Sequence, residues 1–135
     1  MKNKDNNQNQ KLAGSLSDFL CFAIYSTNLA FGRVYKPLFE ELGLTYLQYA
    51  TLIALHEESG QTVSELGEKL FLESNTLTPL LKRLEAMGYV TRKRDTQDER
   101  QVRIGLTPEG VSMDEALRAI DIAIDDQLPV LVLSF

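Results

Sequence analysis

The chain contains one thiol, and a cysteine thiolate is the side chain that attacks peroxides. Cys21 is the only cysteine and lies in the apolar, aromatic run from Phe19 to Tyr25. Attack on a peroxide turns a cysteine into a sulfenic acid. Without a second cysteine, that acid can proceed only to a mixed disulfide with another thiol, ring closure with a backbone nitrogen, or over-oxidation. Most free cysteines among apolar neighbours are structural, so a redox sensor and a structural residue are both open interpretations.

A second set of residues has the chemistry of DNA recognition. Small polar side chains from Ser74 to Thr78 begin a predicted helix. Asparagine can pair bidentately with adenine, and threonine methyls can contact thymine. Basic residues follow, and an arginine on a thin hairpin can enter the minor groove. Helix capping and a solvated surface loop are the alternatives. The candidate DNA-binding residues are Ser74, Asn75, Thr76, Thr78, Pro79, Lys82, Arg83, Arg92, Arg94 and Arg100.

The distribution of charge supports this second site. The formal net charge of −5 is unfavourable for a nucleic-acid binder. Residues 82–103, however, hold seven of the 14 basic side chains against four acidic ones. Salt screens attraction beyond about 8 Å at physiological ionic strength, so a local basic stripe matters more than the total charge.

The segment around Cys21 is predicted to be helical. Ser17 can cap a helix that runs to about Arg33, which places Cys21 about one turn from its start. Free backbone N–H groups in a first turn favour a negative charge such as a thiolate. A second, short helix is expected over Pro37–Leu42, closed by Gly43.

Two capping boxes predict the following helices. Thr45 with Gln48 begins a largely apolar helix that runs to about His56. Thr62 with Glu65 begins a short helix. In each box the threonine oxygen accepts from a free backbone N–H, and the third residue reaches back to the cap.

The remainder of the chain predicts a helix, a hairpin and a last helix. Residues 74–87 place leucines on one stripe at helical spacing. Residues 90–94 and 102–106 have the two-residue alternation of an antiparallel hairpin. The segment 107–127 begins with a threonine cap and a proline and is acidic, and Pro129 is expected to interrupt it. Two adjacent helices and a basic hairpin make a winged helix-turn-helix.

Length and composition are typical of one globular domain. The chain has 135 residues, of which 44% are hydrophobic. One cysteine excludes an intrachain disulfide and fits a reducing compartment. No stretch approaches the roughly 20 apolar residues of a membrane span, and residues 1–11 lack the apolar middle of a signal peptide. We therefore expect a cytoplasmic protein with a flexible leader over residues 1–14 and a single domain over 15–135.

The wing motifs resemble those of the MarR family of transcriptional regulators. The similar segments are Leu77–Glu85, Thr91–Arg94 and Asp98–Thr107, in which Asp98, Arg100 and Leu106-Thr107 form the wing signature. The resemblance implies a winged helix-turn-helix that binds a palindromic operator in double-stranded DNA. It also implies a homodimer.

The resemblance further divides the domain. It implies a winged helix-turn-helix over about 62–106, between dimerisation helices at 15–44 and 107–135. Only 28 residues follow Thr107, fewer than is usual in that family, so the apolar end Leu128–Phe135 is expected either to pack in the dimer or to weaken it.

The N-terminal part is similar to the OhrR branch of that family, which senses organic hydroperoxides. The similar segments are Leu20–Phe22, Tyr25, Tyr35–Leu38 and Leu44–Tyr49. The branch resemblance implies that Cys21 is the reactive thiol and that the hydroxyls of Tyr35 and Tyr46 hold it across the dimer interface. It implies an organic hydroperoxide as inducer, a low-molecular-weight thiol as a possible partner of oxidised Cys21, and release of DNA. An apolar pocket that prefers organic peroxides is expected from Phe19, Phe22 and Phe31.

Other functions have weaker support from the residues. In the same fold, a small aromatic ligand in the dimer cleft could be the inducer, with Cys21 structural. A thiol peroxidase would lack a resolving cysteine and a basic residue beside Cys21, and a dimerisation module would not need the basic wing. His56, the single histidine, cannot form a zinc site with one distant cysteine. No phosphate-binding loop or catalytic triad motif is present, so we expect no metal, no cofactor and no enzymatic activity.

Overall fold

Helices dominate the computed structural model, which describes the backbone of residues 2–133 and the side chains of residues 19–126. The elements are α1 (Lys2–Leu42), α2 (Tyr46–Glu57), β1 (Gln61–Thr62), α3 (Val63–Leu70), α4 (Ser74–Ala86), β2 (Val90–Arg94), β3 (Val102–Leu106), α5 (Pro108–Ser112) and α6 (Asp114–Leu133). The predicted mainly α fold with a β-hairpin wing is confirmed.

The helix α1 is continuous, whereas the sequence predicts two helices. Ser17 lies inside α1 and is not its cap, and Pro37 is accommodated within it. A proline removes one helical hydrogen bond. The helix continues past it because the last turns are held by packing, with Phe39 buried and Tyr35 against the core. Gly43 closes the helix as predicted, with a φ of 67°.

The helix α6 also passes through a proline. It runs to Leu133, so the predicted interruption at Pro129 is wrong. One missing hydrogen bond can be absorbed as a bend in a long helix. The side chains of Leu128–Phe135, which were expected to pack in the dimer or to weaken it, lie outside the described residues.

Both predicted capping boxes are present. The Gln48 backbone N–H donates to Thr45 Oγ1 over 3.2 Å, and Gln48 Oε1 accepts from the Thr45 N–H over 3.0 Å. Thr62 and Glu65 form the equivalent pair of bonds at the start of α3. Thr107 caps α5 by accepting from the Gly110 N–H, also as predicted. These short-range bonds set where α2, α3 and α5 begin.

The sheet has three antiparallel strands in the order β1-β3-β2. The hairpin pairs Arg92 with Ile104 and Arg94 with Val102, which confirms the predicted pairing. The strand β1 was not predicted, because its two residues are polar and too few to show alternation. Gln61 and Thr62 are nonetheless buried, and they pair with β3.

One apolar core joins the helices to the sheet. Its fully buried side chains come from α2, α3, α4, β2, β3 and α6, and they are Leu52, Leu55, Leu66, Leu77, Leu81, Leu84, Val90, Ile104 and Leu117. The leucine stripe of α4 therefore faces inward, and its polar face points outward.

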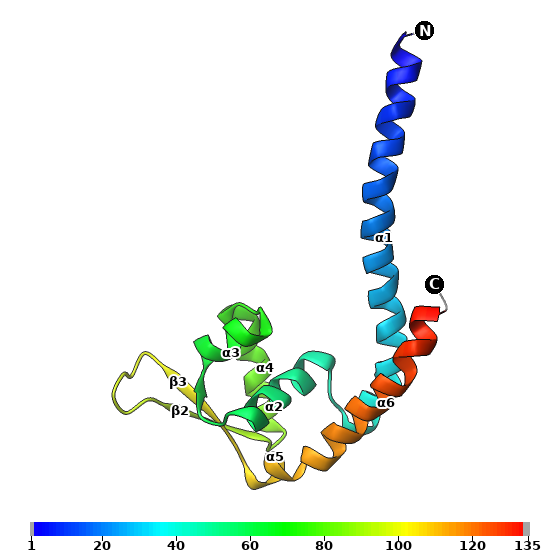
Figure 1. Ribbon diagram of the computed structural model, residues 1–135. Helices are drawn as coiled ribbons and strands as arrows, with labels where there is room; N and C mark the ends of the chain where they lie inside the picture. Colours follow the sequence, from blue (N-terminus) through cyan, green and yellow to red (C-terminus); the bar gives the residue numbers. More distant parts are fainter. Residues whose placement is uncertain (1, 134–135) are drawn as a thin grey trace.

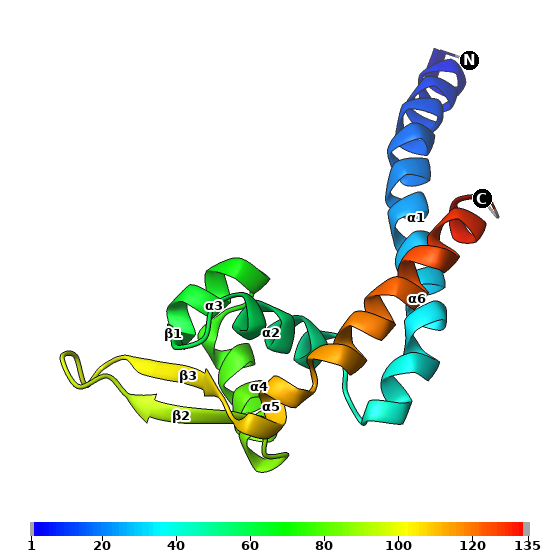
Figure 2. The same cartoon turned by 60° about the horizontal axis from the view of Figure 1, so that its bottom comes forward.

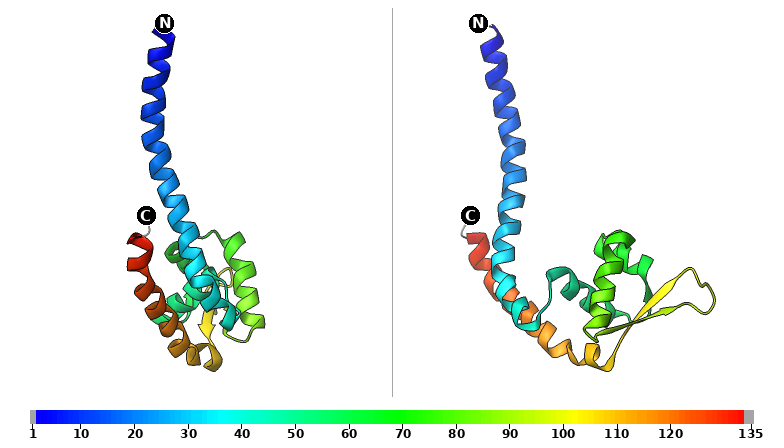
Figure 3. Two further views of the ribbon diagram at one scale, coloured as in Figure 1. Left: turned by 90° about the vertical axis from the view of Figure 1, so that its right-hand side faces the viewer. Right: turned by 180° about the vertical axis from the view of Figure 1, so that it is seen from behind.

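The two long helices each contribute to this core at one end, through Phe39 of α1 and Leu117 of α6, and extend away from it at the other. In Figure 1, α6 runs beside the C-terminal part of α1, and the N-terminal part of α1 (blue) projects beyond the other elements. Figures 2 and 3 show the same arrangement from other sides, with the β2–β3 hairpin projecting away from the long helices. Residues 2–14, predicted to be a flexible leader, form the start of α1.

Candidate redox site and DNA-binding surface

The start of α4 presents unused polar groups. Ser74, Asn75 and Thr76 are exposed, and Thr78 is half-buried beside the inward-facing Leu77. The sequence predicts that one of these polar residues caps the helix, and this is wrong. The cap position is Glu73, and no side chain bonds to the free N–H groups there. The hydroxyls and the amide at the start of α4 are therefore available to another molecule.

Further along α4, the outward face becomes basic. Pro79 is exposed and lies inside α4. Lys82 and Arg83 follow on the same helix and are exposed. Among the described residues neither forms an ion pair, so both can reach phosphates.

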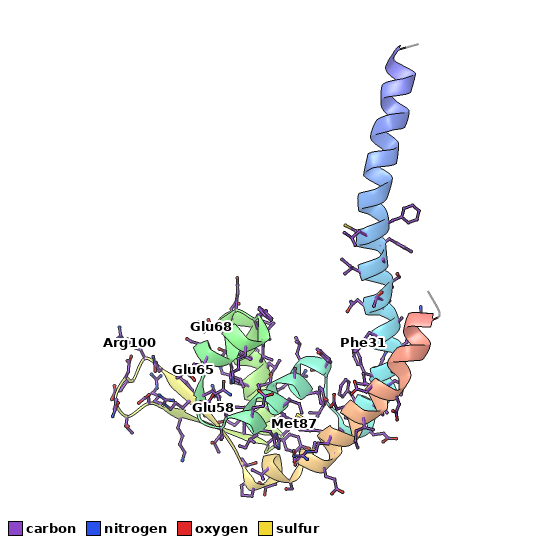
Figure 4. The ribbon with its side chains drawn as sticks, in the orientation of Figure 1. Phe31, Glu58, Glu65, Glu68, Met87 and Arg100 are labelled. Carbon is purple, nitrogen blue, oxygen red and sulfur yellow. The ribbon has the colours of Figure 1, made fainter. Side chains whose placement is uncertain are left out.

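The three wing arginines have different surroundings. Arg92 lies in the middle of β2, not at the hairpin tip as expected, and its Nε donates to Glu85 on α4 over 3.3 Å. Arg94 Nη1 donates to the Glu99 carbonyl over 2.9 Å. Arg100 is at the tip, as Figure 4 shows, and its side chain is 92% exposed. Its Nε donates to Asp98 Oδ1 over 3.1 Å. Of the three arginines, Arg100 alone lies at the tip, where a groove can be reached.

The wing is stiffened by the ion pair of Asp95 and Arg103, neither of which was among the candidate site residues. Asp95 Oδ2 accepts from Arg103 Nε over 2.8 Å, and its Oδ1 accepts from the Gln97 N–H over 2.8 Å. The backbone N–H of Gln97 and then the Arg103 guanidinium hold the pKa of Asp95 below its ordinary value. Arg103 Nη1 also donates to the Gly60 carbonyl over 2.9 Å, which ties the wing to the segment before β1. Opposite charges eight residues apart across a predicted hairpin were the available signal.

Cys21 is exposed in the single chain and lies deep inside α1. The expectation that first-turn N–H groups favour its thiolate is therefore wrong, because that effect is confined to the first turn. The expected apolar pocket is also not formed within one chain. Phe19 and Phe22 are 72% and 64% exposed. Phe31 lies ten residues beyond Cys21, which is about 15 Å along the helix at 1.5 Å per residue.

The predicted thiol-binding tyrosines lie together in an aromatic cluster. The rings of Tyr35 and Tyr46 are 5.2 Å apart, and Tyr35 is also 5.2 Å from Phe39. This cluster borders a hollow of about 560 Å³ between α1 and the start of α2, which Arg33 and Lys36 also line. The two tyrosines are thus brought together, as the resemblance implies.

Cys21 and the tyrosines are not brought together within one chain. Fourteen residues of continuous helix separate Cys21 from Tyr35, a distance of about 21 Å at 1.5 Å per residue. A rigid helix cannot close that distance. Contact between the thiol and the hydroxyls would require a second chain.

Burial changes the behaviour of a neighbouring tyrosine. Tyr49 lies on α2, with its ring 4.9 Å from that of Phe39. Desolvation, with the nearby carboxylates Asp121 and Asp125 of α6, raises the pKa of Tyr49 to about 12. Tyr49 is therefore a neutral link between α2 and α6 at physiological pH.

The described side chains, those of residues 19–126, do not form a metal-binding cluster. That part of the chain brings together no group of three or more His, Cys, Asp or Glu side chains suited to a metal ion. His56 instead lies 2.8 Å from the Leu52 carbonyl through Nδ1. Within the same described region, no helix combines the length and apolar character needed to cross a bilayer.

With this geometry in place, comparison with known proteins identifies the family. The family of transcriptional regulators SarA/Rot matches residues 33–117, which span the aromatic cluster, α4 and the wing. The chain belongs to this SarA/Rot family. Its place among the MarR-type transcriptional regulators, predicted from the wing motifs, is confirmed.

Curated SarA/Rot relatives include proteins from distant bacteria. The HTH-type transcriptional regulator TtmR of Methylorubrum extorquens is 57% identical over 96 residues, which cover 71% of this chain and 49% of TtmR. The organic hydroperoxide resistance transcriptional regulator of Bacillus subtilis is 46% identical over 107 residues, which cover 79% of this chain and 71% of that protein. The chain thus spans about half the length of TtmR, and the predicted relationship to the hydroperoxide branch is confirmed.

Solved structures give the same fold. Reduced AbfR bound to DNA superposes with a TM-score of 0.77 at 40% identity and covers 87% of this chain and 83% of that one. Disulfide-formed AbfR gives 0.64 at 41% identity, with 92% and 82% covered. A MarR transcriptional regulator from Methanosarcina mazei gives 0.74 at 25% identity, with 87% and 83% covered. The winged-helix fold of the MarR type is therefore shown for this chain.

Proposed function

We propose that this regulator is a repressor that binds a palindromic DNA operator as a homodimer and releases it when an organic hydroperoxide oxidises Cys21. The exposed, uncapped polar groups at the start of α4, beside Lys82, Arg83 and the wing, support DNA binding most directly. The reduced AbfR structure is bound to DNA, which supports the same role here. A regulator that binds the chromosome of a bacterium would work in the cytoplasm.

In the proposed complex, each part of the surface has its own role. The start of α4 enters the major groove, where Ser74, Asn75, Thr76 and Thr78 face base edges. Pro79 lies on the same outward face. Lys82 and Arg83 bind phosphates, Arg94 and Arg100 extend toward the minor groove, and Arg92 orients the wing through Glu85. Loss of any phosphate-binding cation would lower the salt dependence of binding by about one unit of slope.

The homodimer is supported by an uncovered apolar surface on α1. Phe22, Ile24, Tyr25 and Leu29 are between 44% and 64% exposed in the single chain. Phe22, Tyr25 and Leu29 lie on one face of the helix, and contiguous exposed apolar surface on a soluble protein usually marks an interface. A second copy that covers this surface would bring Cys21 of one protomer to Tyr35 and Tyr46 of its partner.

In the proposed redox step, each Cys21 consumes one organic hydroperoxide and one low-molecular-weight thiol. The Cys21 thiolate attacks the outer peroxide oxygen, the O–O bond breaks, and an alcohol leaves after taking up a proton. The sulfenic acid then reacts with a low-molecular-weight thiol to form a mixed disulfide and water. Over-oxidised AbfR is bound to DNA, so the disulfide is the better candidate for the DNA-releasing form. A second thiol would restore Cys21 by exchange.

The test is fluorescence anisotropy with labelled duplex from the upstream region of the protein's own gene. Reduced wild type should bind, lose affinity when an alkyl hydroperoxide and a thiol are added, and recover with dithiothreitol. Cys21→Ser should bind equally well and not respond. A Cys21→Ser protein that releases DNA like the wild type would disprove the redox switch, and wild type that never binds would disprove the repressor.

A second candidate function rests on the hollow beside the aromatic cluster. Its volume of about 560 Å³ suits a small aromatic ligand between α1 and α2. In that case Cys21 is structural, and the inducer acts by changing the packing of these helices. A small aromatic acid that weakens DNA binding by wild type and by Cys21→Ser alike would favour this alternative.

A further inference from the structure

The turn between α3 and α4 contains an unusual residue. Phe71 follows the last residue of α3 in the left-handed conformation, with φ 57° and ψ 39°, and its N–H donates to the Gly67 carbonyl. It is the only described non-glycine residue with a positive φ. Glycine and asparagine adopt this conformation at the lowest cost, whereas an aromatic residue is disfavoured there.

The Phe71 ring does not contribute to the core. It is 94% exposed, while its neighbour Leu72 packs against the core. The shape of the turn is set by backbone and by Gly67, where an added Cβ would lie 2.7 Å from the Leu72 carbonyl oxygen. The left-handed conformation thus costs free energy in the isolated chain, and the ring gains none from burial in return. Such an outlier suggests a contact that forms only in a complex.

Phe71 lies close to the proposed base-facing residues of α4, which indicates that its partner is DNA. Phe71 and Ser74 line one hollow of about 440 Å³ between the first turn of α3 and the start of α4, together with Ser64 and Gly67. Ser74 is the first of the proposed base-facing residues. A duplex with α4 in its major groove therefore has its backbone next to this hollow.

The charged side chains beside Phe71 limit which part of the DNA backbone can lie there. Glu68 and Glu73 line the same hollow and are exposed, and Figure 4 shows Glu68 on the outer side of α3. These carboxylates repel phosphates. Any DNA contact at this hollow is therefore made by the uncharged Phe71 ring and not by the carboxylates. The apolar part of the DNA backbone that a ring can pack against is the deoxyribose.

We propose that Phe71 is a further DNA-contact residue, whose ring packs against a deoxyribose of the backbone beside the bases that α4 faces. This inference rests on the proposed DNA-binding function. The contact neutralises no phosphate, so it adds affinity without changing the salt dependence of binding. It would also hold the start of α4 in register along the groove.

The proposal predicts opposite effects on stability and on binding. Phe71→Asn keeps a residue that tolerates the left-handed conformation and removes the ring. Its melting temperature should equal or exceed that of the wild type, because asparagine adopts the left-handed conformation at lower cost and the exposed ring has no burial to lose. Its dissociation constant for the operator duplex should rise about five- to twentyfold with an unchanged salt slope, as for truncation of an aromatic interface residue.

The experiment compares wild type, Phe71→Asn and the matched control Phe71→Tyr by anisotropy at four salt concentrations and by thermal melting. Phe71→Tyr retains the ring and should bind within about twofold of the wild type. Unchanged affinity in Phe71→Asn, or equal losses in both variants, would overturn the Phe71 contact while leaving the repressor intact. A reduced salt slope in Phe71→Asn would also overturn it. Wild type that binds no duplex would overturn both proposals.

Discussion

At the scale of single residues, the chemistry of Cys21 depends on groups that its own chain does not supply. The helix α1 places the thiol about 21 Å from Tyr35, at 1.5 Å per residue over 14 residues. Tyr35 and Tyr46 are paired with each other, 5.2 Å between rings, and not with the thiol. If Cys21 is the proposed sensor, its thiol has no tyrosine donor within one chain and would gain the hydroxyls of Tyr35 and Tyr46 only on assembly.

Tyr35→Phe should slow oxidation of Cys21 by cumene hydroperoxide about tenfold. The change keeps the stacked ring and removes a hydroxyl that would donate a charge-assisted hydrogen bond to the partner's thiolate, a bond of about 1.5 kcal/mol or more. The rate is measured by the loss of free thiol with time. Tyr89→Phe, which lies between α4 and β2 and packs against the core, is the control and should react like the wild type. Equal rates in all three proteins would exclude a role for the Tyr35 hydroxyl.

Tyr49 should give the fold a dependence on alkaline pH. Its pKa is raised from 10.0 to about 12, so its neutral form stabilises the fold fully below pH 10 and this stabilisation is lost as the pH rises to about 12. Tyr49→Phe has no phenol to ionise and should lose less stability over that range. Chemical denaturation at several pH values between 9 and about 12 makes the comparison. Parallel curves for the two proteins would mean that Tyr49 has the same pKa in the folded and the unfolded chain.

At the scale of elements, the wing is stiffened by one carboxylate as well as by its strand pairing. Asp95 binds both the Gln97 N–H and the Arg103 guanidinium, and Arg103 reaches the Gly60 carbonyl. The hairpin is thereby fixed at its tip and at its junction with β1. Rigid presentation of the tip reduces the ordering cost when Arg100 enters a groove.

Asp95→Asn should weaken DNA binding although it removes a negative charge from the wing. The amide can still accept from Gln97 but no longer attracts Arg103, so the tip becomes more mobile. Since the pKa of Asp95 is held below its ordinary value of 3.8, its stabilising effect is present above that pH and is lost as the pH falls below it. The stabilities of the two proteins should therefore converge in acid.

Anisotropy and chemical denaturation test the Asp95 prediction. Glu99→Gln makes the same change of charge at an exposed tip residue whose backbone carbonyl alone is used, by Arg94. That control should bind DNA at least as tightly as the wild type, because a repulsive charge is removed. Tighter binding by Asp95→Asn as well would show that charge, not wing order, governs affinity.

At the scale of the whole molecule, the long helices point to assembly. The helix α1 projects beyond the body and carries exposed aromatic side chains, with α6 beside it (Figure 1). The core side chains are buried within the body. The apolar side chains of the projecting part of α1 are instead exposed to water in the single chain, which is unfavourable. Both DNA recognition and thiol chemistry would then depend on the same interface.

Phe22→Glu should dissociate the proposed dimer. A carboxylate placed in an apolar interface without a partner costs several kcal/mol, so the dimer dissociation constant should rise at least about 100-fold. Sedimentation velocity over a range of concentrations measures it, and affinity for a palindromic duplex should fall in parallel. Val111→Glu, at a 55% exposed apolar residue of α5, is the control and should remain dimeric. A dimer that survives Phe22→Glu would place the interface elsewhere.

The sequence by itself determined the features that depend on short-range bonds and local patterns. The caps at Thr45, Thr62 and Thr107 each involve residues three apart, and each is present. The hairpin follows from the alternation around Val102 and Ile104, and the family follows from motifs in α4 and the wing.

Tertiary structure alone decided the features that depend on distant residues. Packing of Phe39 and Tyr35 makes α1 continuous through Pro37. The same helix begins at Lys2 and not at Ser17, which places Cys21 away from any helix end. Pairing with β3 converts Gln61 into a buried strand residue. In each case a local signal is overruled by contacts that the chain forms only when it folds, because burial can offset a lost hydrogen bond or an unfavourable local preference.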